Sequence, residues 1–126
     1  MPVTGAGPYD PSNIFARILR GEIPSRRVYE DEWAVAFHDI APQAPVHVLV
    51  IPRGPYVALA DFVAGAPEAE IAGFFRAVGR VAAQLGLEEP GYRILSNKGL
   101  HAGQEVPHLH VHLFGGAPLG PMLVKD

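Results

Sequence analysis

The sequence contains no cysteine, which excludes a disulfide framework, a thiolate nucleophile and a zinc site built on thiolates. No apolar run approaches the ~18–20 residues that a membrane-spanning helix requires. Ten basic residues within a formal net charge of -3 provide no dense positive surface for a nucleic-acid duplex. The first residues also lack the basic start and continuous apolar stretch of a secretion signal. These absences predict a cytoplasmic protein without a nucleic-acid or membrane partner.

The composition that remains is that of one globular domain. The chain has 126 residues, of which 48% are hydrophobic and 18% are charged. This length is sufficient for one hydrophobic core and too short for two. We expect residues 1–11 to form a flexible arm and residues 12–126 to form the domain. A single phosphate group remains a possible ligand, because backbone amides and imidazoles can hold it without adding formal charge.

The pattern of elements predicts an α+β fold. Asn13 is placed to cap a short helix over residues 14–19, which ends before Gly21. Strands are predicted over 27–30, 33–37, 46–51 and 91–96, with the first two forming an antiparallel hairpin. A long helix starts at Pro67 and stops at Gly86. Its apolar stripe, which we expect to pack on the sheet, consists of Ile71, Phe74, Phe75, Val78, Val81, Ala82 and Leu85.

The most informative stretch is a row of three histidines, His108, His110 and His112, which we call the histidine row. Leu109, Val111 and Leu113 alternate with them, and strict alternation predicts a half-buried strand with the three imidazoles on one face. Three purely structural imidazoles on one face would be unfavourable, since protonation would create a patch of like charge. A metal site is the competing chemical interpretation, because three histidines can bind catalytic zinc. Evenly spaced rings on one strand fan outward, so we predict no metal and no other cofactor.

A phosphoryl group is the ligand that best fits the row. His110, flanked on both sides, is the predicted nucleophile, and His112 is the predicted general acid for the leaving group. His47, inside the predicted strand 46–51, can exchange protons with the row. The loop 97–106 leads into the row, and its glycines allow backbone amides to turn toward an anion.

The segment 103–116, Gly-Gln-Glu-Val-Pro-His-Leu-His-Val-His-Leu-Phe-Gly-Gly, resembles the signature of the histidine-triad (HIT) superfamily, in particular its HINT-like branch. Two further blocks match in order and spacing. They are the segment 14–24, with Ile14, Phe15 and Gly21-Glu22-Ile23-Pro24, and the segment 37–47, from Phe37 to His47. The resemblance covers residues 12 to 124.

This resemblance implies a HIT-like α+β fold with an antiparallel sheet of about five strands, a short N-terminal helix and one long helix. It implies a homodimer whose two sheets join. It also implies hydrolysis of the P–N bond of purine nucleoside 5′-phosphoramidates, AMP or GMP linked to an amine, through a covalent nucleotidyl-histidine. Two alternatives remain open: a dinucleoside polyphosphate hydrolase, and a nucleotide-binding interaction module with vestigial hydrolysis.

Matching positions give the expected roles. The catalytic set is His110 as nucleophile, His112 and His47 in the proton relay, and His108 in support of the strand. Asp39 matches the residue that holds the ribose hydroxyls. The base pocket is expected from Ile14, Phe15, Ile18, Ile23, Phe37, Ile40 and Leu49, and the phosphate-side loop from Asn97, Gly103, Gln104, Glu105 and Val106. Glu105 departs from the family pattern, in which some members carry serine, and its charge favours a cationic leaving group.

Overall fold

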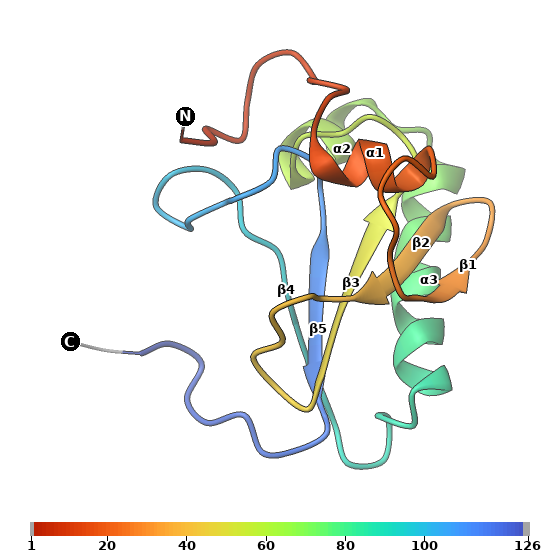
Figure 1. Cartoon of the computed structure of the whole chain (residues 1–126), viewed down its shortest axis with the longest axis vertical. Coiled ribbons are helices and arrows are strands. Elements are labelled where there is room, and N and C mark those ends of the chain that lie inside the picture. The colour runs from red at the N-terminus through yellow and green to blue at the C-terminus, as the bar shows by residue number, and fades with distance from the viewer. Residues whose placement is uncertain (1, 125–126) are drawn as a thin grey trace.

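The structure is a computed structural model that describes residues 2–124. Its elements are α1 (Ile14–Leu19), β1 (Arg27–Glu30), β2 (Ala34–His38), β3 (Val46–Pro52), α2 (Leu59–Gly65), α3 (Glu68–Gln84), β4 (Arg93–Leu95) and β5 (Val111–Gly115) (Figure 1). The five strands form one antiparallel sheet in the order β1-β2-β3-β5-β4. The predicted α+β fold, with a short helix near the N-terminus and one long helix, is confirmed. None of the helices within residues 2–124 combines the length and apolar character needed to cross a lipid bilayer.

The helix ends follow the local sequence in two of the three helices. Asn13 caps α1, because its Oδ1 accepts a hydrogen bond of 2.9 Å from the Ala16 N–H. Pro67 precedes α3, and Glu68 and Glu70 lie in its first turn, where the helix dipole favours acidic side chains. The short α2 was not predicted, since Ala58 at its N-cap cannot cap with a side chain. The available signal was Asp61, whose carboxylate accepts the N–H groups of Val57 and Ala58 at 2.8 Å each.

One face of the sheet packs against α2 and α3. Ala34, Ala36, Val48 and Val50 point to this side, together with the three apolar residues that alternate with the histidine row, as predicted. The helices contribute Phe62, Phe74, Ala77, Val78, Val81 and Ala82. Phe75 was expected in the same stripe, but it is 41% exposed because it lies at the margin of the helix face that meets the sheet.

The opposite face of the sheet is only partly covered. Phe15 and Ile18 of α1 pack against Val35, Phe37, Leu49 and Ile51 of β2 and β3. This second small core leaves β5 and the adjoining part of β3 without a covering helix on that side (Figure 1). His47 and His112 point to this open face, since their strand neighbours Val48, Val111 and Leu113 belong to the α3 side. The partial cover creates a place for a site.

The segment that precedes α1 has contacts with the domain. Gly5 is buried against the loop 97–104, and Tyr9 reaches His108. Flexibility of residues 1–11 stays a prediction, although the structure places these two residues against the domain. Met1, Lys125 and Asp126, which the predicted arm and domain include, lie outside the described residues.

Candidate active site

The histidine row approaches the site as extended chain and enters the sheet only at its end. β5 begins at Val111, so His112 is the one member of the row inside a strand, and the prediction of a strand through all three was wrong. The ladder to β3 stops at the Val50–Val111 pair. Before that point Pro107 has no N–H to donate, and the Leu109 N–H donates instead to the Tyr56 carbonyl of a loop at 2.8 Å. The ring centroids of His110 and His112 are still 5.1 Å apart.

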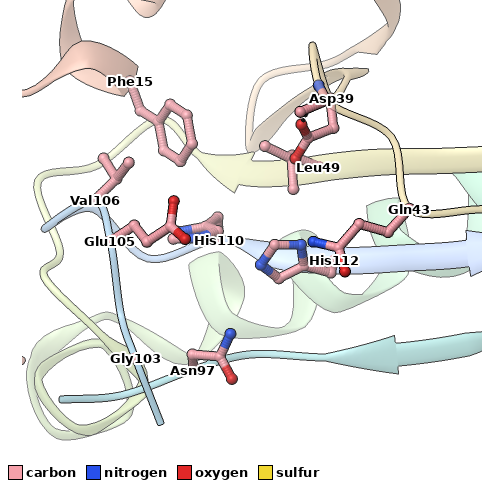
Figure 2. A pocket seen from close by; sticks show the side chains of 11 residues that line it. Phe15, Asp39, Gln43, Leu49, Asn97, Gly103, Glu105, Val106, His110 and His112 are labelled. Atoms are coloured by element: carbon pink, nitrogen blue, oxygen red, sulfur yellow. Dashed lines mark hydrogen bonds between the residues drawn. The ribbon is translucent and has the colours of Figure 1, made fainter. Parts of the chain in front are cut away.

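The ring of His110 is oriented by the backbone of the row itself. Its Nδ1 is 2.7 Å from the carbonyl oxygen of His108. A carbonyl can only accept, so Nδ1 carries the proton and Nε2 is the bare nitrogen of the neutral ring. The Ser96 hydroxyl donates to the His110 carbonyl at 2.8 Å and fixes the main chain of the same residue. His110 lines a cavity, and Nε2 is the ring nitrogen that this hydrogen bond leaves unprotonated (Figure 2).

His112 receives its orientation from His47 on the neighbouring strand. The Gln43 N–H donates to His47 Nδ1 at 3.1 Å, which leaves the proton of the neutral His47 ring on Nε2. His47 Nε2 is 2.9 Å from His112 Nδ1, so it donates there, and the His112 proton must reside on Nε2. The two cavity-facing histidines therefore differ: His110 offers a bare nitrogen and His112 offers an N–H.

Burial keeps all four rings neutral at neutral pH. Loss of solvation lowers the pKa of His108 to about 4. Burial, aided by the neighbouring His110 and His47, lowers the pKa of His112 to about 4. The pKa values of His110 and His47 are also lowered, chiefly by burial, although Asp39 opposes the shift in both. A neutral imidazole is the form that can attack phosphorus.

The cavity has a volume of about 250 Å³ and adjoins a groove of about 300 Å³. Phe15, Asp39, Leu49, Glu105 and Val106 line both, so the two spaces are continuous. Among the other expected residues, the cavity adds Asn97, Gly103, His110 and His112, and the groove adds Ile14, Ile18, Ile23, Phe37 and Ile40. Nearly all the expected contact residues, drawn from both halves of the chain, are thus brought together.

Three expected residues lie behind the cavity wall. His47 and His108 are buried and act on the neighbours that line the cavity. Gln104 is buried as well, and its amide bridges three backbone groups: it accepts from Gly99 N–H at 2.9 Å and donates to the carbonyls of Val57 and Val106 at 2.9 and 3.1 Å. Gln104 therefore braces the loop and does not line the cavity where substrate contact was expected.

The expected anion-binding loop also differs from its prediction. Gly99 and Gly103 do adopt positive φ angles, +79° and +71°. The Gly103 N–H donates to the Leu100 carbonyl at 3.2 Å, and the Gln104 N–H donates to the Gly99 carbonyl at 3.1 Å. With the Gly99 N–H held by Gln104, these three amides serve the loop and do not face an anion.

Sequence reasoning missed Pro24, Ser25 and His38 in the groove lining, and four residues at or behind the cavity. Gln43 and Ala41 line the cavity from the proline-rich loop before β3, Ser96 supports His110, and Tyr9 contacts His108. Gln43 is visible in Figure 2 beside His112. A signal for Gln43 existed, since it is the polar side chain of the loop 40–45 nearest in sequence to His47. No sequence signal pointed to Ser96 or Tyr9, because only tertiary packing brings them to the row.

Within residues 2–124, Asp39, His47 and His112 form a group that could hold a metal ion, with one ligand atom of each within 4.8 Å of the others. The nitrogens of His47 and His112 are only 2.9 Å apart, and a proton fits between them. Two histidine nitrogens on one tetrahedral zinc ion lie about 3.3 Å apart. The geometry of this pair is therefore that of a hydrogen bond, and a metal would require the rings to separate.

The fold and the site together define a small α+β protein in which a cluster of histidines lies at a cavity on the open side of an antiparallel sheet. The family model described as HIT domain matches residues 20–119. The chain belongs to the HIT domain family, which confirms the resemblance found in its sequence.

Several relatives span almost the whole chain. An uncharacterized 13.2 kDa HIT-like protein of Azospirillum brasilense is 68% identical over 117 residues, which cover 93% of this chain and 96% of that protein. The purine nucleoside phosphoramidase of Escherichia coli K12 is 46% identical over 110 residues, which cover 87% of this chain and 92% of that protein.

Solved structures of similar fold also cover most of the chain. The crystal structure of a HIT family hydrolase from Legionella pneumophila has a TM-score of 0.79 at 39% identity, covering 85% of this chain and 95% of that chain. A histidine triad protein from Clostridium difficile has a TM-score of 0.77 at 38% identity, covering 87% and 95%.

Proposed function

We propose that this protein hydrolyses the P–N bond of purine nucleoside 5′-phosphoramidates through a nucleotidyl intermediate on His110. The observation that carries the proposal is the complementary state of the two cavity histidines, a bare Nε2 on His110 and an Nε2–H on His112. Such a pair suits attack on phosphorus and proton delivery to a leaving nitrogen. The named activity of the Escherichia coli relative, at 46% identity, supports the same reaction.

In the first half-reaction, His110 Nε2 forms a bond to phosphorus while the bond from phosphorus to the amine breaks. The His47–His112 pair takes up one proton when the anionic phosphoryl group binds, and His112 passes a proton to the leaving nitrogen. In the second half-reaction, water attacks phosphorus and the bond to His110 breaks. The water gives one proton to the His47–His112 pair, which restores the proton that the pair donated to the amine. Cleavage of the bond to His110 releases the nucleoside monophosphate. The His108 carbonyl keeps the His110 Nδ1 proton in place throughout.

The rest of the substrate fits the two connected spaces. The groove, with its isoleucines and phenylalanines, suits a purine base. Asp39 lies where the groove meets the cavity, and one of its carboxylate oxygens is held by the Ala41 N–H at 2.8 Å. We assign its other oxygen to the ribose hydroxyls, because a carboxylate accepts from a cis-diol.

The charge of the cavity favours a phosphoramidate over a dinucleoside polyphosphate. Asp39 and Glu105 are the charged side chains among its described lining residues, and no lysine or arginine joins them. A polyphosphate brings several negative charges that this lining does not balance. An amine leaving group with a second, positively charged nitrogen is instead attracted by Glu105 (Figure 2). We therefore propose conjugates of cationic amines as the preferred substrates.

A panel of AMP conjugates tests both proposals. We expect kcat/KM for a conjugate of a diamine to exceed that of the equally long neutral amine by about fivefold, as expected for a solvent-exposed charge pair. Diadenosine polyphosphate should be a poor substrate. Glu105→Gln should bring the two amine conjugates to equal rates, whereas Glu89→Gln, an exposed substitution away from the cavity, should preserve the difference. A preference for the polyphosphate would contradict the function, and an unchanged ratio in Glu105→Gln would contradict only the assignment to Glu105.

We further propose that two copies associate through the β4 edge of the sheet. β4 pairs with β5 on one side, and its other side is the end of the described sheet. Ile94, Leu95 and the nearby Leu59 and Phe75 are 45%, 36%, 43% and 41% exposed, a concentration of apolar surface beside an open strand. A second copy would cover both features and continue the sheet.

Sedimentation equilibrium tests this association. We expect a dimer for the natural sequence and a monomer for Ile94→Asp, because a carboxylate would be buried at the strand edge. Leu100→Asp introduces the same charge at a residue of the loop 97–106 that is 61% exposed, and this variant should remain dimeric. A monomeric natural protein at micromolar concentration would contradict the assignment.

A further inference from the structure

Tyr9 contacts the histidine row from a segment that lies before the residues matched by the family model. Its hydroxyl is 2.6 Å from His108 Nδ1, and the two rings meet edge to face with centroids 5.6 Å apart. His108 is fully buried, and its Nε2 is 2.9 Å from the Pro52 carbonyl, so Nε2 carries the proton. Nδ1 is therefore the acceptor and the Tyr9 hydroxyl is the donor. Burial also raises the pKa of Tyr9, which keeps its hydroxyl protonated.

The ring that Tyr9 holds belongs to the residue that orients the nucleophile. The His108 carbonyl accepts the Nδ1 proton of His110 at 2.7 Å. Ring and carbonyl of His108 are thus fixed at three points: by Tyr9, by Pro52 and by His110. Removal of the Tyr9 hydroxyl would leave Nδ1 of a fully buried ring without its donor. Any rotation of the ring to find another partner would break the bond to Pro52 and loosen the packing of the residue whose carbonyl orients His110.

Local hydrogen bonds determine where Tyr9 lies. The carboxylate of Asp10 accepts the Ser12 N–H at 2.9 Å, and the Asn13 side chain donates to the Asp10 carbonyl at 2.8 Å. Earlier in the segment, Gly5 is buried against the loop of Gly99 and Gln104. The segment is therefore attached on both sides of Tyr9, which is how a residue outside the matched family region reaches the row.

We propose that Tyr9 is a positioning residue for the reaction: its hydroxyl holds His108, and His108 in turn aims His110 at phosphorus. This inference rests on the proposed role of His110 as nucleophile. A positioning group acts on the geometry of the attack and not on substrate affinity, so its loss affects kcat more than KM.

Tyr9→Phe tests the proposal, since it keeps the aromatic ring and removes only the hydroxyl. We expect kcat on an AMP–amine conjugate to fall about tenfold while KM changes by less than about twofold. Tyr9→Ala should lower kcat at least as much, because the hydroxyl and not the ring carries the effect. Tyr29→Phe is the matched control: the Tyr29 hydroxyl also donates to one acceptor, Asp31 Oδ2 at 2.7 Å, but it lies on β1 away from the cavity. Its kcat should equal that of the natural protein.

The ring nitrogens provide a readout that does not depend on turnover. In the natural protein, ¹⁵N NMR should show His108 Nδ1 as a hydrogen-bonded acceptor and His110 Nδ1 as protonated. In Tyr9→Phe, the His108 Nδ1 signal should shift and the His110 Nδ1 proton should exchange faster with solvent. An unchanged kcat in Tyr9→Phe would overturn the proposal, whatever the ring signals show. A natural protein that turns over no phosphoramidate would instead refute the proposed function.

Discussion

His110→Ala is expected to lower kcat on an AMP–amine conjugate by about 10⁴-fold or more, because it removes the protein atom that bonds to phosphorus in the proposed reaction. Water would then have to displace the amine in one step, without the covalent intermediate. Steady-state kinetics with natural protein and variant measure the loss. Labelled nucleotide should remain bound to the natural protein after an alkaline quench, which preserves phosphorus–histidine bonds, and none should remain on the variant.

The control for this prediction is another histidine of the same chain. His101→Ala removes an exposed imidazole that does not line the cavity, so its kcat should match that of the natural protein. Circular dichroism of His110→Ala should show retained secondary structure, since His110 lies in extended chain before β5. Equal turnover by His110→Ala and by the natural protein would eliminate His110 as nucleophile.

The pH dependence of the reaction should reflect the lowered pKa of His110. We expect kcat/KM of the natural protein to persist somewhat below pH 6.5, because the attacking nitrogen stays unprotonated there. Steady-state kinetics across this pH range measure it.

His112→Asn should produce a loss that depends on the leaving group. For an alkylamine conjugate, whose nitrogen must gain a proton to depart, we expect kcat to fall by ~10²–10⁴-fold. For the 4-nitrophenyl ester of AMP, whose phenolate leaves without a proton, the loss in the first-turnover release of nitrophenolate should stay below about tenfold. The physical reason is that His112 directs an Nε2–H to the cavity while His47 holds its Nδ1.

The comparison of the two substrates is what makes this prediction specific. A general collapse of the cavity would slow both substrates alike, and equal losses would therefore contradict the role of His112 as general acid. His101→Asn introduces the same residue at an exposed position and should alter neither rate. The dependence on leaving group also separates His112 from His110, whose removal should slow both substrates severely.

The Tyr9 and Glu105 assignments give the site two features that its histidines do not supply. Glu105 belongs to the cavity wall, and its charge bears on which amine is expelled. Tyr9 lies behind the wall, and its hydroxyl bears on how His110 is held. Their variants therefore differ in kinetic signature: Glu105→Gln should change the ratio between substrates, and Tyr9→Phe should change kcat for every substrate.

The elements of the fold were largely predictable because their signals are local. Asn13 before an apolar helix, β-branched residues from Val46 to Ile51, and the stripe ended by Gly86 each specify an element within a few residues. The strand boundaries of the row were not predictable, since β5 begins where its ladder to β3 begins, at the Val50–Val111 pair, although β3 itself continues to Pro52. The exposure of Phe75 likewise depends on how α3 lies on the sheet.

The sequence by itself determined which side chains the proposed reaction uses, because alternation puts His110 and His112 on one side of an extended chain and the resemblance adds His47 and Asp39. Only the tertiary structure decided what each ring does. The carbonyl of His108 and the ring of His47 select the nitrogens that bear protons, and both contacts depend on hydrogen-bond geometry between segments. Hydrogen bonds between distant segments likewise hold Gln104 inside the loop and hold Tyr9 against His108, which is 99 residues away in sequence. A spacing pattern records neither, since hydrogen-bond partners distant in sequence are chosen by packing.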